Sequence, residues 1–97
     1  MYETAFKPIP GAGRLVAYTA TATVNAANSV APTNAIAVYV SCSSAAYVCV
    51  DKTKTAATST DLGVPANVPV ILRCEPGDNI SAVQQAAGGN LTYCWLC

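Results

Sequence analysis

Residues 35–42 read AIAVYVSC, and this stretch decides the fold class of the 97-residue chain. Its apolar side chains recur at every second position, so one face of an extended strand carries Ile36, Val38, Val40 and Cys42. This is the clearest period of two in the sequence, and it predicts a central β-strand. Two serines at residues 43–44 predict a short turn, after which residues 45–50, AAYVCV, return as the second arm of a hairpin.

Similar stretches lie on both sides of this strand. Residues 15–24 alternate threonine with alanine over much of their length, which predicts a shallow strand. Residues 68–74 place Val70, Leu72 and Cys74 on one face, and residues 79–84 predict a further strand. Residues 91–97, LTYCWLC, are largely apolar on both faces, so this last strand is expected inside a sheet or an interface.

Turn-forming residues separate these strands. Residues 75–78, EPGD, have proline at the second position and glycine at the third, the signature of a type II turn. Polar residues 51–66 predict an exposed loop that crosses between sheets, with at most a short edge strand at residues 53–58. About seven short strands with turns at intervals of roughly 8 to 12 residues predict an all-β fold, either a single small antiparallel β-sandwich or a jelly-roll-like barrel.

The first 14 residues differ in composition from the rest of the chain. Proline and glycine crowd their second half, KPIPGAGR, and predict an extended N-terminal arm at residues 1–14 in front of a β-sandwich domain at residues 15–97. A frayed terminus would share this composition. The arm also carries large apolar side chains that would gain from packing on a neighbour, and we expect these to anchor it: Tyr2, Phe6 and Ile9.

Low and balanced charge limits the partners of this chain. Five Lys and Arg balance five Asp and Glu, and charged residues make up only 10% of the sequence. Such a balance gives no electrostatic attraction to nucleic acid or to an anionic membrane, so neither partner is expected. Little like-charge repulsion separates the copies, and a domain this small gains stability from oligomerisation or from docking on a larger body.

Catalysis is not expected from this sequence. The chain has no histidine, the side chain best suited to proton transfer near neutral pH and the commonest metal ligand. Its acidic residues are scattered: Glu3, Asp51, Asp61, Glu75 and Asp78. A glycosidase-like pair needs two acids that face one cleft with separated pKa values, which this spacing does not favour. We therefore expect no enzyme activity and no cofactor.

Five cysteines are the other distinctive feature: Cys42, Cys49, Cys74, Cys94 and Cys97. An odd number leaves at least one thiol unpaired in any disulfide scheme within one chain. Residues 2–8 do not resemble a secretory signal, so we expect synthesis in a reducing cytoplasm and favour thiols that pack in the core. Disulfides are an alternative. A metal site is a weaker one, because residues three apart on a strand, such as Cys94 and Cys97, point to opposite faces.

The order of motifs over residues 35–96 resembles the small all-β virion proteins of tailed bacteriophages. The matching segments read AIAVYV (35–40), AYVCV (46–50), AAT (56–58), VPANVP (64–69), PGDNISAV (76–83) and GGNLT (88–92). The resemblance implies a capsid decoration, or cement, protein that sits on the outside of the head, commonly as a trimer, and clamps neighbouring coat subunits. It implies no catalytic residues. The cysteines and the proline- and glycine-rich arm depart from the pattern.

On this basis we expect a virion structural protein made in the host bacterial cytoplasm and located on the capsid surface. Its expected partners are the major capsid protein and copies of itself, as a homotrimer. The side chains expected at the capsid or subunit interface come from the arm and the last strand: Tyr2, Phe6, Ile9, Tyr93 and Trp95.

Two other functions fit the sequence. A tail, neck or head-fibre base component would share the same sandwich and the same assembly chemistry. A carbohydrate-binding or adhesive module would present coplanar aromatic rings on an open face, and its only candidates are Tyr39, Tyr47, Tyr93 and Trp95. Their alternation within strands favours a core or interface role instead.

Overall fold

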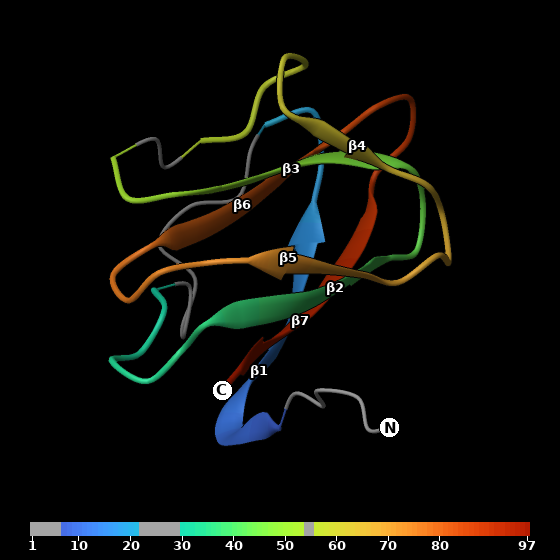
Figure 1. Cartoon of the computed structure of the whole chain (residues 1–97). Helices are drawn as coiled ribbons and strands as arrows, with labels where there is room; N and C mark the ends of the chain where they lie inside the picture. Colours follow the sequence, from blue (N-terminus) through green and yellow to red (C-terminus); the bar gives the residue numbers. More distant parts are fainter. Residues whose placement is uncertain (1–6, 22–29, 54–55) are drawn as a thin grey trace, which may run out of the picture.

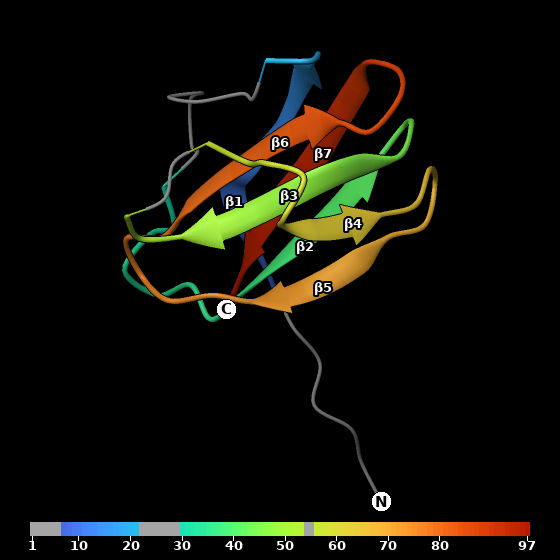
Figure 2. The same ribbon diagram turned by 90° about the horizontal axis from the view of Figure 1, so that it is seen from above.

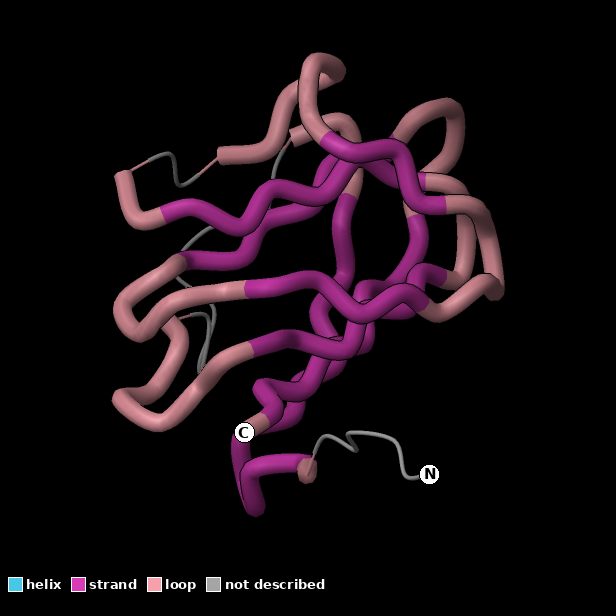
Figure 3. The backbone as a smooth tube through the Cα atoms, in the orientation of Figure 1, coloured by secondary structure: helices cyan, strands magenta, loops and turns pink. Residues whose placement is uncertain are grey.

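A computed structural model of the chain describes residues 7–21, 30–53 and 56–97. These residues form seven strands: β1 (Pro8–Tyr18), β2 (Ala37–Cys42), β3 (Ala46–Asp51), β4 (Leu62–Val64), β5 (Val70–Arg73), β6 (Asn79–Gln84) and β7 (Gly89–Leu96). Strands and loops account for the whole described part of the chain (Figure 3), which thus contains no helix that could cross a lipid bilayer.

The strands form two antiparallel sheets that pack face to face (Figures 1 and 2). The first sheet has the strand order β1-β7-β2-β5, and the second has the order β4-β3-β6. The prediction of an all-β fold is confirmed, and of the two architectures that the sequence allowed the structure is the small sandwich rather than a closed barrel.

Strands β7 and β2 occupy the centre of the first sheet. Strand β7 pairs with β1 on one side and with β2 on the other, where Trp95 lies opposite Val38 and Tyr93 opposite Val40. The interior position predicted for both strands is confirmed. An interior strand is shielded from water by a neighbour on each side. This position suits a strand such as β7, whose side chains are largely apolar on both faces.

The hairpin predicted for residues 35–50 is wrong. Strand β2 belongs to the first sheet and β3 to the second, so residues 43–45 cross from one sheet to the other. The backbone of this crossing bonds to the start of β7 and to the connection that precedes it: Ser43 N–H donates to the Asn90 carbonyl at 3.0 Å, and Gln85 N–H donates to the Ala45 carbonyl at 3.2 Å. Alternation alone does not distinguish a hairpin from two strands that face each other across the core.

The long polar segment also differs from its prediction. It was expected to cross between sheets, yet β3 and β4 at its two ends pair in the same sheet, with Val48 opposite Leu62. Within it, Ala57 N–H donates to the buried Ser81 hydroxyl at 3.0 Å, which ties the loop to its own sheet. The crossing comes later, at residues 65–69, where Asn67 has a φ of 60° and its N–H donates to the Cys42 carbonyl at 2.8 Å.

The predicted N-terminal arm is part of the sandwich over its described residues. Strand β1 begins at Pro8 rather than Leu15, and pairs with β7 across a bulge between Pro8 and Gly13. Lys7 and Cys97 exchange backbone hydrogen bonds of 3.0 and 2.9 Å, so the pairing extends one residue further. Prolines and a glycine fit here because β1 is an edge strand, where a missing donor and a bulge are tolerated.

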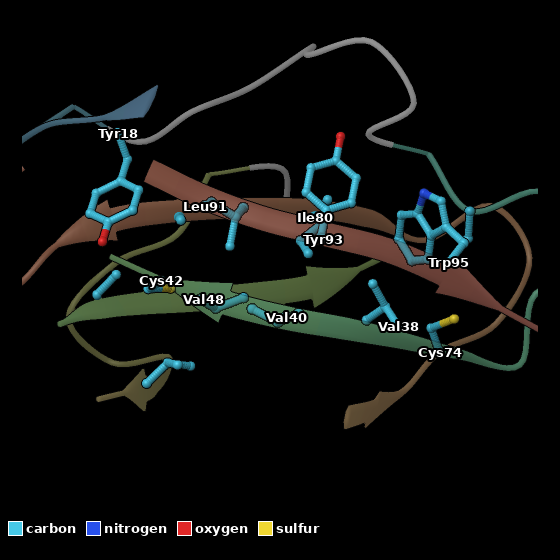
Figure 4. Packing of buried hydrophobic residues seen from close by; sticks show 14 of the residues in the cluster. Tyr18, Val38, Val40, Cys42, Val48, Cys74, Ile80, Leu91, Tyr93 and Trp95 are labelled. Atoms are coloured by element: carbon cyan, nitrogen blue, oxygen red, sulfur yellow. The ribbon is translucent and has the colours of Figure 1, made fainter. Parts of the chain in front are cut away.

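The core lies between the sheets and contains the single tryptophan of the chain and two of its tyrosines. Tyr18, Tyr93 and Trp95 are at most 1% exposed and pack among aliphatic side chains (Figure 4). The Tyr93 and Trp95 rings meet edge to face, with centroids 6.0 Å apart and planes at 70°. Among the described residues, every buried side-chain nitrogen and oxygen has a hydrogen-bond partner.

The turn predicted at residues 75–78 is confirmed. Gly77 has a φ of 89°, the conformation that a type II turn requires at its third position, and Asp78 N–H donates to the Glu75 carbonyl at 3.1 Å. The Asp78 carboxylate also accepts the Glu75 N–H at 2.8 Å. This turn connects β5 to β6 and therefore carries the chain from the first sheet to the second.

A hydrogen-bonded junction at one end of the sandwich joins the β2–β3 crossing to the neighbouring strands β1 and β7. The Tyr18 hydroxyl donates to the Ser44 carbonyl and accepts from the Ser44 N–H at 3.2 Å. The Ser44 hydroxyl donates to the Gly88 carbonyl at 3.0 Å, and the Ser43 hydroxyl accepts the Asn90 N–H at 2.8 Å. We call this the Tyr18 junction. It holds the end of β1, the β2–β3 crossing and the start of β7 together.

We predict that Gly89→Ala destabilises the protein through this junction. An added Cβ would lie 2.5 Å from the Ser44 hydroxyl oxygen, 2.6 Å from that of Ser43 and 2.9 Å from that of Tyr18. The serines would have to rotate away and give up their hydrogen bonds, so the free energy of unfolding should fall by about 1–3 kcal/mol. Urea unfolding monitored by tryptophan fluorescence measures this change.

Gly13→Ala is the matched control in strand β1. Its added Cβ would meet nothing closer than the Tyr93 carbonyl oxygen at 3.4 Å, an ordinary contact. Because alanine loses less backbone entropy on folding than glycine, this variant should be neutral or up to about 1 kcal/mol more stable. Equal losses in the two variants would contradict the role of the junction.

Candidate interaction surface

The outer face of the first sheet carries a row of apolar side chains. Ile71 on β5 lies directly opposite Tyr39 on β2, and Tyr39 lies directly opposite Cys94 on β7. Opposed residues in an antiparallel pair point to the same side, so these three side chains form one row across three strands. Ile71 is 52% exposed and Tyr39 is 37% exposed, which are high values for an isoleucine and a tyrosine in strands.

Two more apolar side chains widen this row at its two ends. Leu15 on edge strand β1 is 66% exposed and lies opposite Thr92, two residues from Cys94 on the same face of β7. Ile36 is 52% exposed just before β2. We call the surface formed by Leu15, Ile36, Tyr39 and Ile71 the apolar face. Exposed apolar side chains on one face of a sheet are a surface that a partner could cover.

A groove of about 680 Å³ cuts into the apolar face beside edge strand β5. Its floor consists of small side chains, because Ala35 and Ala37 are only 1% and 2% exposed. Ile36 and Ile71 stand on its rim. Arg73, opposite Ala37 in the sheet register, and Glu75 in the following turn add one positive and one negative charge. The groove therefore combines an apolar centre with a balanced pair of charges.

A smaller hollow of about 410 Å³ lies next to this groove and is more polar. It is lined by Asp51, Lys52, Arg73, Cys74, Glu75 and Asp78. Both signs of charge are present, and among the described residues no group of three or more acidic, cysteine or histidine side chains has a geometry that could hold a metal ion. Two of the acidic side chains of this hollow, Asp51 and Asp78, already accept hydrogen bonds from nearby backbone N–H groups.

The structure separates the residues predicted at the interface. Tyr93 and Trp95 are 1% and 0% exposed, because β7 directs them into the core, and so neither offers a surface to a partner in this structure. Ile9 is half-buried and packs against the core cluster. Tyr2 and Phe6 lie outside the described residues. The outward-facing residues of the last strand are instead Thr92 and Cys94.

Ile36 was predicted to point inward with Val38, and this prediction is wrong. Val38 is fully buried, whereas Ile36 is half exposed and the preceding Ala35 takes the buried position. The backbone of Ile36 still bonds to that of Leu96 at 2.9 Å and of Cys74 at 3.1 Å. Alternation therefore breaks at the end of the sheet, where β2 proper begins at Ala37, and this break creates the rim of the groove.

The four aromatic residues considered for carbohydrate binding do not share one face. Two of them, Tyr93 and Trp95, are in the core, as the alternation within strands indicated. Tyr39 lies on the outer face of the first sheet, and Tyr47 lies on β3 in the second sheet. These four rings do not form the coplanar platform that stacking on a sugar needs.

The cysteines divide by environment, and all five are free thiols. Core packing is confirmed for Cys42, Cys49 and Cys74, which are buried, whereas Cys94 and Cys97 are half-buried. Burial raises the pKa of Cys42, against a smaller lowering effect of a hydrogen bond with the Tyr18 hydroxyl. Burial also raises the pKa of Cys74, and the nearby Asp78 carboxylate adds to the increase. Both shifts favour the neutral thiol over the reactive thiolate.

Comparison with known proteins finds no relative of this chain. No family model matches the chain, and no curated protein or solved structure matches it either.

We predict that the protein loses stability as the pH rises above about 9. Burial raises the pKa of Tyr93 as well as those of Cys42 and Cys74, so the folded chain keeps protons that the unfolded chain releases. The stabilisation from these groups is complete below the unfolded pKa and is lost as the pH rises toward the folded pKa. Urea unfolding between about pH 8 and pH 10.5 should show a falling midpoint, and Cys74→Ala should make the decline shallower. A constant or rising midpoint would contradict the prediction.

Proposed function

We propose that this chain is a structural protein that assembles through its apolar face. The observation that carries the proposal is the exposure of Ile36, Tyr39 and Ile71 on the outside of one sheet, around a groove with an apolar floor. Covering these side chains would remove apolar surface from water at about 25 cal/mol per Å². Only one arginine and one glutamate line the groove, so few charges would have to be desolvated.

Among structural roles, we favour capsid decoration on the outside of a tailed-bacteriophage head. The support is the order of strand and turn motifs over residues 35–96, together with a sequence that is only 10% charged. On this proposal the major capsid protein and copies of this chain are its partners, and its location is the virion surface.

The decisive experiment for this role is a cryo-EM map of the particle with which the protein co-sediments. We expect density for a small two-layer sandwich on the outer surface of the shell, with the face that bears Tyr39 turned toward a coat subunit or another copy. Density at the tail or neck would contradict capsid decoration and favour the tail or head-fibre alternative. Absence from every particle would contradict a virion protein.

We predict that Ile71→Lys weakens binding to that particle at least about tenfold, because the substitution places a charge in the middle of an apolar interface. Leu62→Lys is the matched control, since Leu62 is 49% exposed against 52% for Ile71 and also lies on an edge strand, but in the other sheet. Co-sedimentation across a range of protein concentrations measures both affinities. Equal binding by the two variants would mean that the apolar face is not the interface.

A further inference from the structure

We infer that the groove beside β5 binds a second copy of this chain, related to the first by a two-fold axis. The inference rests on the proposed function, because it names an occupant for the same apolar face. It goes further by assigning a symmetry and a set of charge contacts. It also differs from the trimer that the sequence resemblance implied.

The charges of the groove make it complementary to itself. Arg73 and Glu75 are two residues apart, both exposed, and line the same hollow. Within the described residues neither side chain forms an ion pair. A partner of a single charge sign would attract one of these residues and repel the other. A second copy turned by a two-fold rotation presents the pair in reverse order, so each Arg73 faces a Glu75 and each Glu75 faces an Arg73.

The shape of the groove is also complementary to itself. Ala35 and Ala37 form a recessed floor, while Ile36 and Ile71 protrude at its rim with 52% of each side chain exposed. Each copy therefore supplies both a hollow and the side chains that could fill one. In an isologous interface the same patch serves on both partners, so a rim isoleucine of one copy enters the floor of the other. The charge pairs on the rim set the orientation, while the buried isoleucines provide most of the affinity.

The test uses sedimentation equilibrium of the full chain at several concentrations in low salt. We expect a monomer–dimer equilibrium for the natural sequence. Arg73→Glu alone would place like charges opposite each other twice per dimer and should weaken the dimer at least about tenfold, and Glu75→Arg alone should do the same. The double variant, R73E with E75R, keeps the net charge of the natural chain and restores both pairs, so it should dimerise like the natural protein.

Mixing the two single variants gives an independent check. One chain then carries two acidic side chains at these positions and the other two basic ones, so equimolar mixing should restore a 1:1 dimer. Circular dichroism of each variant verifies that the sandwich is folded. A monomeric or trimeric natural chain, unchanged dimerisation in the single variants, or failure of the double variant to recover would each overturn the inference.

The experiments distinguish a failure of the two-fold pairing from a failure of the proposed function. If the natural chain is monomeric but Ile71→Lys still abolishes binding to the particle, the two-fold pairing is wrong and the assembly role stands. If Ile71→Lys alters neither self-association nor particle binding, the assembly role of the apolar face is wrong as well. Leu62→Lys serves as the control in both assays, because it changes the charge on the opposite sheet.

Discussion

The fold depends on how the last strand enters the first sheet. Strand β7 lies between β1 and β2. It therefore pairs with the first strand of the chain on one side and with β2, the strand predicted to be central, on the other. Its inward side chains are Leu91, Tyr93 and Trp95, all at most 1% exposed. Burying one tryptophan removes about 200 Å² from water, worth about 5 kcal/mol. That is a large share of the 5–15 kcal/mol that stabilises a typical domain. The other sheet closes over these side chains of β7, which are among the largest in the core.

Much of this architecture could be predicted from alternation and turn chemistry. The all-β class, the interior positions of β2 and β7, and the EPGD turn follow from local patterns that tertiary structure does not overrule. Which strands pair could not be predicted, because a period of two gives the buried face of a strand but not its neighbour. The Ser43 and Ser44 pair looks like a hairpin turn in sequence, and only the placement of β2 and β3 in different sheets identifies it as a crossing.

The candidate surface was missed for the same reason. The sequence places Ile71 and Arg73 on the face opposite Leu72, but nothing in it says that Ile71 lies across from Tyr39. Register brings the two together, and register is decided by pairing over a separation of some thirty residues. Tyr93 and Trp95 were predicted at the interface because β7 is apolar on both faces. Such a pattern does not reveal which face is turned toward the core, and the space between the sheets accommodates the two large rings.

A chain with so few charges must avoid open-ended association, and the strand edges indicate how it does so. Edge strands β4 and β5 have three and four residues, and Pro8, Pro10 and a bulge interrupt β1. At β6, Ala31 N–H bonds to Asp78 and Gln84 N–H bonds to Thr19, so both ends of that edge are covered. Short, interrupted or covered edges are poor templates for further strands. What remains exposed is a sheet face, and on the inference above a second copy bound across a two-fold axis would cover it in a single closed contact. Closed symmetry of that kind permits a neutral, apolar surface without unlimited growth.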